Sequence, residues 1–122
     1  MYFCCMENEV NESFEILLAA CQTADSNLAV AYKQLRDLLE RLCRAQMQDE
    51  SLQMTDLSAR ISFVSARAGL TIVEQNRLHT FRLTSNAILN RKEEPVREKL
   101  LRDAKTLAFF IRKLYEVEIP GE

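Results

Sequence analysis

The chain has 122 residues, of which 48% are hydrophobic, and it contains two glycines and two prolines. This length and apolar content exclude a disordered chain and predict one folded domain over residues 1–122, with residues 1–6 and 118–122 expected to be poorly ordered. The scarcity of glycine and proline excludes an all-β fold, which needs many turns, and favours an all-α, compact antiparallel bundle of four or five helices.

The net charge of −2 indicates no particular partner, but the charge is distributed unevenly. Residues 1–59 carry ten acidic and four basic side chains, a net charge of −6, whereas residues 77–113 carry ten basic and four acidic ones, a net charge of +6. Either the two halves attract each other inside one bundle, or the second half presents a basic surface to phosphates or an acidic partner.

The first residues, MYFCCMENE, have no basic stretch and too short an apolar run for a signal peptide. No apolar run approaches the ~20 residues that span a bilayer, so we expect no membrane partner. The four cysteines form no C-x-x-C pair, which favours reduced thiols and a cytoplasmic location.

Residues 7–47 carry apolar side chains at alternating spacings of four and three, which predicts helix. This row comprises Val10, Phe14, Leu17, Cys21, Ala24, Leu28, Ala31, Leu35, Leu38, Leu42 and Ala45, and it is widened by Leu18, Tyr32 and Leu39. The unbroken row favours one long helix. The residues Thr23–Asn27 favour two, because Asp, Ser and Asn prefer helix caps, and compactness also favours a break there.

The next helix is predicted from Leu52 or Asp56 to Ala68, and Gly69 suits the left-handed position that ends a helix. Its predicted core row is Met54, Leu57, Ile61, Val64 and Ala68. The helix after it, within Thr71–Asn90, is expected near the centre of the bundle, since it carries apolar residues on two flanks. Thr71 and Glu74 match the capping box, in which each side chain satisfies an unpaired backbone N–H.

The last helix is predicted from Pro95, which suits a first helical turn, to about Val117. One face of this helix is predicted to be buried: Val96, Leu100, Ala104, Leu107, Phe110, Ile111 and Leu114.

Catalytic signatures are missing from the chain. There is no glycine-rich phosphate loop, and His79 is the single histidine, without an H-E-x-x-H or E-x-x-H partner. We therefore predict no enzyme activity, no cofactor, no metal site and no small-molecule substrate.

Arg77 lies on the same side of its helix as Val73, Thr84 and Ile88, which indicates a position facing the core. A buried guanidinium needs a partner, and we expect Asp103 first and Asp56 second. Alternatively, the side chain reaches solvent along its stem. Both readings give Arg77 a structural role.

Two groups of residues form a candidate interaction surface. Gln75, His79, Arg82 and Asn86 make a polar strip opposite Arg77, which is either a solvated face or a site for phosphate, RNA or peptide. Phe109 projects from the last helix among Arg102, Lys105 and Arg112, so it could stack on a base, anchor a protein partner or pack on a neighbouring helix.

The segments LHTFRLTSNAILN, Leu78–Asn90, and LLRDAKTLAFFIRKL, Leu100–Leu114, resemble the helical region that precedes the motor in some bacterial superfamily 1-type helicases or ATPases. This resemblance implies an accessory docking module of a larger DNA-processing protein and transfers no functional residue. We therefore expect a non-catalytic interaction module or a homodimer. The alternatives are a nucleic-acid-binding module that uses residues 77–113 and, third, a small bundle enzyme.

Overall fold

A computed structural model describes residues 2–46 and 56–115, and these residues form helices without any strand. The helices are α1 (Tyr2–Thr23), α2 (Leu28–Gln46), α3 (Leu57–Ala68), α4 (Ile72–Leu89) and α5 (Arg97–Tyr115). The predicted all-α bundle is confirmed. Leu52, the first of the two predicted starts of the third helix, Met54 of its predicted core row and the predicted end of the last helix at Val117 lie outside the described residues.

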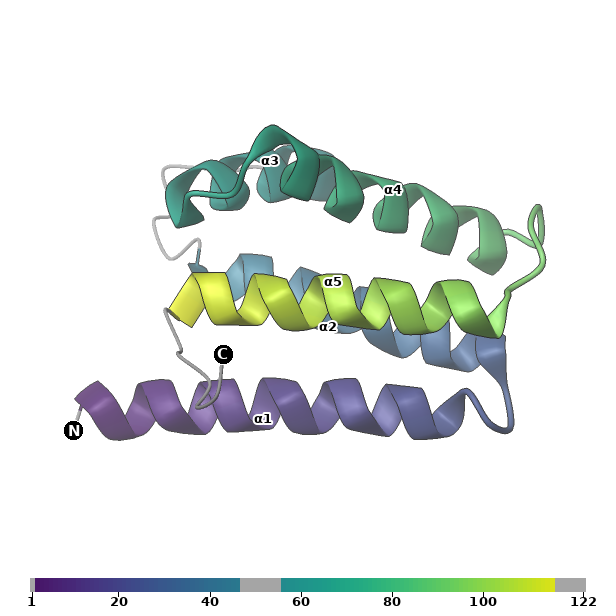
Figure 1. Ribbon diagram of the computed structural model, residues 1–122, viewed down its shortest axis with the longest axis horizontal. Helices are drawn as coiled ribbons and strands as arrows, with labels where there is room; N and C mark the ends of the chain where they lie inside the picture. Colours follow the sequence, from purple (N-terminus) through teal and green to yellow (C-terminus); the bar gives the residue numbers. More distant parts are fainter. Residues whose placement is uncertain (1, 47–55, 116–122) are drawn as a thin grey trace.

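The helices are arranged in three layers (Figure 1). Helices α2 and α5 form the middle layer, α1 packs against both of them on one side, and α3 and α4 lie on the other. Helix α2 touches all four other helices, and its buried face includes Tyr32, Leu35 and Leu39. The centre of the bundle is therefore α2, and the expectation that Thr71–Asn90 would be central is wrong.

The helix is interrupted between α1 and α2, as the polar residues at Thr23–Asn27 predicted. The side chain of Asn27 caps α2, since its Oδ1 accepts a hydrogen bond from the backbone N–H of Val30 at 3.2 Å. The four-and-three row is buried or half-buried on both sides of the break. Leu18 is an exception to the widened row: it is 62% exposed, because it lies on the side of α1 away from the bundle.

Helices α3 and α4 begin and end at the residues that the sequence indicated. Asp56 caps α3, and Gly69 ends it with φ of 79°, a left-handed conformation that glycine adopts without a side-chain clash. Thr71 Oγ1 accepts from the backbone N–H of Glu74 at 3.2 Å, and the Glu74 carboxylate accepts from that of Thr71 at 2.8 Å. The predicted capping box is confirmed.

Helix α5 begins two residues later than predicted. Pro95 precedes the helix, and the carbonyl of Val96 accepts the hydrogen bond from the backbone N–H of Leu100 at 3.0 Å. Val96 is exposed, so its assignment to the core was wrong, because it stands at the helix boundary and not on the regular helical face. The rest of the predicted face, from Leu100 to Leu114, is buried or half-buried.

The core is continuous across the three layers and contains Tyr32, Phe81 and Phe110, which are fully buried. The rings of Tyr32 and Phe81 stack with centroids 6.1 Å apart, so they join α2 to α4. Within the described ranges, none of the helices combines the length and the apolar character that a membrane crossing requires.

Candidate interaction site between α4 and α5

The orientation of α4 decides which of its residues can meet a partner. Leu78, Phe81 and Ile88 are buried, whereas Ile72 is 77% exposed and Leu83 is 57% exposed. Only one of the two apolar flanks of this helix packs on the bundle, because α4 lies in an outer layer (Figure 1). An apolar row therefore remains on the surface of α4.

Arg77 is exposed on α4, so the expectation that it would be buried is wrong. The helix is rotated such that Leu78 and Phe81 point into the core, which leaves Arg77 and the 61% exposed Val73 at its edge. The alternative reading, in which the guanidinium reaches solvent, is the one that the structure supports.

Asp103, the expected partner of Arg77, is bound to a different residue. Its Oδ2 accepts a hydrogen bond from the hydroxyl of Tyr32 at 2.9 Å. Burial raises the pKa of the Asp103 carboxyl, while the hydrogen bond from Tyr32 acts in the opposite direction. Asp56, the second expected partner of Arg77, caps α3 instead, with its Oδ1 3.1 Å from the backbone N–H of Ser58.

Replacement of Arg77 by alanine should change the free energy of unfolding by less than about 0.5 kcal/mol, because an exposed side chain contributes little to folding. Urea unfolding followed by circular dichroism measures this difference. A loss of ~3 kcal/mol or more would instead indicate a buried, paired guanidinium.

The polar strip Gln75–His79–Arg82–Asn86 lies on the other side of α4, and its four residues are half-buried. His79 Nε2 and Ser62 Oγ on α3 are 3.1 Å apart, so the strip takes part in the packing of α3 against α4. Burial lowers the pKa of His79, and the neighbouring positive charge of Arg82 adds to this effect. A neutral, helix-contacting histidine is less suited to hold a phosphate than a free cation.

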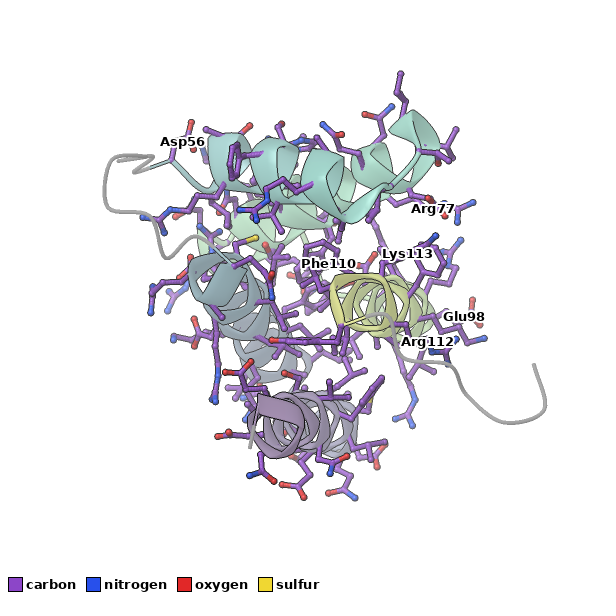
Figure 2. All side chains as sticks on the ribbon, turned by 90° about the vertical axis from the view of Figure 1, so that its left-hand side faces the viewer. Asp56, Arg77, Glu98, Phe110, Arg112 and Lys113 are labelled. Atoms are coloured by element: carbon purple, nitrogen blue, oxygen red, sulfur yellow. The ribbon has the colours of Figure 1, made fainter. Side chains whose placement is uncertain are left out.

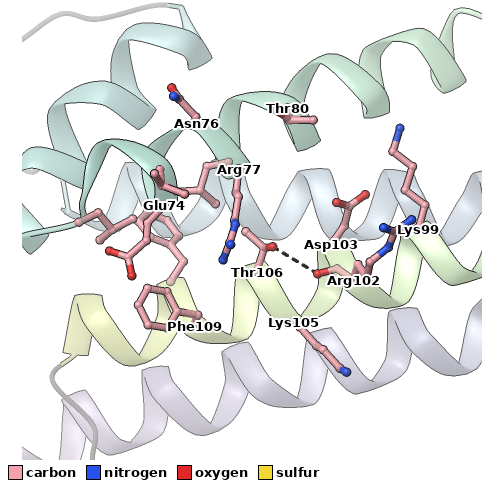
Figure 3. A pocket seen from close by; sticks show the side chains of 14 residues that line it. Glu74, Asn76, Arg77, Thr80, Lys99, Arg102, Asp103, Lys105, Thr106 and Phe109 are labelled. Carbon is pink, nitrogen blue, oxygen red and sulfur yellow. Dashed lines mark hydrogen bonds between the residues drawn. The ribbon is translucent and has the colours of Figure 1, made fainter.

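A groove of about 730 Å³ lies between α4 and α5 (Figure 3). Five of its lining side chains are apolar: Leu70, Val73, Leu78, Phe109 and Phe110. This volume and lining are within the range of ligand and peptide sites in proteins.

Basic side chains also line this groove, namely Arg77 from α4 and Lys99, Arg102 and Lys105 from α5, against the acidic Glu74 and Asp103. Lys99 pairs with Glu93 at 3.5 Å. Among the described residues, Arg77, Arg102 and Lys105 form no ion pair. Arg77 extends from α4 toward α5 (Figure 3), so the groove combines apolar side chains with an excess of basic over acidic ones.

Phe109 lines the groove and is half-buried. The ammonium of Lys113 lies 5.7 Å from the centre of its ring, a cation–π geometry that occupies one face of the ring. Of the predicted surface, the groove thus brings together Arg102, Lys105 and Phe109. Arg112 and the polar strip of α4 do not line it, whereas Arg77, for which a structural role was predicted, does.

The part of the chain that the structure describes contains no group of three or more His, Cys, Asp or Glu side chains able to hold a metal ion. Burial raises the pKa of the Cys43 thiol to about 12, so this cysteine stays protonated and is a poor nucleophile at neutral pH.

Comparison of the chain with protein-family models, curated proteins and solved structures found no match.

Proposed function

We propose that this chain is a non-catalytic docking module that holds a protein partner at the groove between α4 and α5. One observation carries the proposal: exposed Val73 and half-buried Phe109 line the same groove as the exposed cations Arg77 and Arg102, which form no salt bridge among the described residues. Binding sites are typically concave and combine apolar side chains with a few polar groups, and aromatic and arginine side chains are enriched where partners bind. The resemblance to the helical region of helicase-like proteins accords with an accessory module in a larger DNA-processing protein.

The charge of the groove favours a different protein over a second copy of this chain. A two-fold dimer places the same patch of both copies against each other. A dimer centred on this groove would therefore bring Arg77 and Arg102 toward their own copies, and like charges in an interface cost several kcal/mol.

Nucleic-acid binding is the alternative, since residues 77–113 carry a net charge of +6. Two features of the groove disfavour it. Lys113 covers one ring face of Phe109, which hinders stacking of a base, and the carboxylates of Glu74 and Asp103 would face the phosphates. Retention on heparin or DNA that weakens steeply with salt would support this alternative against the docking proposal.

Site-specific photo-crosslinking in the producing cells tests the proposal. A photoreactive amino acid at Val73 should give one protein adduct of defined mass, and the same amino acid at the equally exposed Leu18 on α1 should give none. The adduct should be protease-sensitive, nuclease-resistant and lost on Phe109→Asp in a variant whose melting curve shows that it is folded.

Three results would contradict the docking proposal. An adduct of twice the chain's mass would indicate a homodimer, and a nuclease-sensitive adduct would indicate nucleic acid. Equal adducts from Val73 and Leu18 would indicate that the groove has no specific partner.

A further inference from the structure

The groove between α4 and α5 also constrains the kind of protein segment that can occupy it. Its lining residues run from Lys99 to Phe110 along α5. At 1.5 Å per residue, this stretch is about 16 Å long, the length of roughly three turns of an α-helix. A short helix laid along the groove matches this length.

The apolar side chains of the groove suit one face of such a helix. Exposed Val73 and half-buried Phe109 stand on opposite sides of the groove, and half-buried Leu70 lies just before α4. Phe110, labelled in Figure 2, points into the bundle and is fully buried beneath them. Helices that bind in grooves insert side chains spaced i, i+3, i+4 and i+7 into linings of this kind. An extended strand would instead need an open sheet edge to satisfy its backbone, which the described all-helical residues lack.

The unpaired cations indicate the charge of the partner. Arg77 on α4 and Arg102 and Lys105 on α5 form no salt bridge among the described residues, and they line the groove from both helices. The positive charge of Arg102 does act on the carboxyl of Asp103, whose pKa it lowers. Arginine binds carboxylates with two parallel hydrogen bonds, so glutamate or aspartate on the flanks of a docked helix would find preformed partners.

We infer that the groove binds an acidic amphipathic helix of about three turns, whose apolar face contacts Val73 and Phe109 and whose carboxylates pair with Arg77 and Arg102. This inference rests on the proposed docking function and adds the chemistry of the partner. The acidic Glu74 at the same groove repels a carboxylate placed beside it, so it restricts where the acidic residues of the docked helix can lie and thereby contributes to specificity.

A designed peptide is a direct probe of this inference. The peptide has about 18 residues, with leucines spaced i, i+3, i+4 and i+7 on one face and glutamates on both flanks, and carries a fluorescent label. Fluorescence anisotropy with the full chain should show saturable binding that weakens as salt is added. Two control peptides, one with lysine in place of glutamate and one with the leucines scrambled off the common face, should bind at least tenfold more weakly.

Charge reversal on the protein locates the binding site. The double variant Arg77→Glu, Arg102→Glu should weaken binding of the glutamate peptide at least tenfold, and it should restore binding of the lysine peptide. The matched control is Arg44→Glu, Arg91→Glu, which alters the net charge by the same amount at exposed positions outside the groove and should leave the affinity within about twofold. Circular dichroism establishes that both variants are folded.

The experiments distinguish between an acidic-helix inference that is wrong and a docking proposal that is wrong. Absence of binding, or equal binding of the glutamate and lysine peptides, overturns the acidic-helix inference, while a specific adduct at Val73 would still support docking. Equal loss in both double variants would likewise overturn the inference, since it would show attraction by net charge alone. Displacement of the peptide by single-stranded DNA at equal concentration would overturn it in favour of nucleic acid.

Discussion

Phe81→Ala should lower the free energy of unfolding by about 3–5 kcal/mol, the usual cost of removing a buried aromatic ring. Phe81 is fully buried on α4, and its ring stacks on Tyr32 of α2 with centroids 6.1 Å apart. The substitution removes this stacking and leaves a cavity between the outer and middle layers, which the bundle can close only in part. Since small domains are stable by about 5–15 kcal/mol, the loss should be evident in both urea and thermal unfolding.

Leu83→Ala is the matched control on the same helix. Leu83 is two residues from Phe81 but 57% exposed, so its truncation should cost less than about 0.5 kcal/mol. A similar cost for both substitutions would mean that α4 is rotated differently from the orientation in which Phe81 faces α2. That result would also change which side chains of α4 line the groove of the proposed docking site.

Much of the fold could be predicted from local signals. The capping residues Asp56 and Thr71 and the left-handed Gly69 mark helix ends through hydrogen bonds and backbone angles that involve only nearby residues. The break at Thr23–Asn27 has the same origin, since Asn27 caps α2 with its own side chain. Such signals do not depend on how the helices pack together.

The orientation of α4 could not be predicted in the same way. Apolar residues occupy two of its flanks, so either could have faced the core, and the choice depends on where α2 and α5 lie. Val73, Arg77, Thr84 and Ile88 were assigned to one buried side. Thr84 and Ile88 are buried, whereas Val73 and Arg77 are exposed. A helix with two apolar flanks is itself the signal that could have been used, because in an outer layer one flank must remain exposed.

Only some of the residues that line the groove could be grouped from the sequence, for a related reason. Arg102, Lys105 and Phe109 follow one face of a single helix, and helical spacing was enough to group them. Arg77 lies near them only because α4 packs beside α5. The spacing of residues within each helix does not determine how the two helices are placed relative to each other. The hydrogen bond from Tyr32 to Asp103 joins residues 71 positions apart and was missed for the same reason.

The separation of charge has two consequences in the structure. Arg97 pairs with Asp25, so one cation of the basic half is neutralised by the acidic half, as expected for attraction within a bundle. Arg77, Arg102 and Lys105 find no such partner among the described residues and line the groove instead. Internal pairing therefore accounts for only part of the basic half, and the remainder is what makes the groove suited to an acidic partner.

The cost of replacing Asp103 should depend on whether the new side chain can still accept the hydrogen bond from Tyr32. Asp103→Leu removes the acceptor and leaves the hydroxyl of Tyr32, a fully buried residue, without its partner, which should cost about 1–3 kcal/mol. Asp103→Asn keeps an amide oxygen that accepts the same hydrogen bond, so it should cost little at any pH. Urea unfolding of the two variants at neutral pH measures the difference.

The stability of Asp103→Asn relative to the unchanged chain should depend on pH. Burial raises the pKa of Asp103 in the folded chain above the ordinary value of 3.8, so the folded state holds this proton more tightly than the unfolded state does. The contribution of this group to stability is therefore full below the unfolded pKa and is lost as the pH rises through the folded pKa. Asp103→Asn cannot ionise, and its stability relative to the unchanged chain should increase from about pH 3 to neutral pH, where it should be at least as stable.

A relative stability that instead decreased with rising pH would show that the ionised carboxylate is favoured in the folded chain. The positive charges of Lys99 and Arg102 already act in that direction on the pKa of Asp103, and that outcome would mean that they, or a pairing with Arg77, outweigh the effect of burial. The double variant Arg77→Ala, Asp103→Asn decides between the two arrangements. If Tyr32 is the partner of Asp103, the effects of the two substitutions should add within about 0.5 kcal/mol, whereas paired side chains would show a larger coupling.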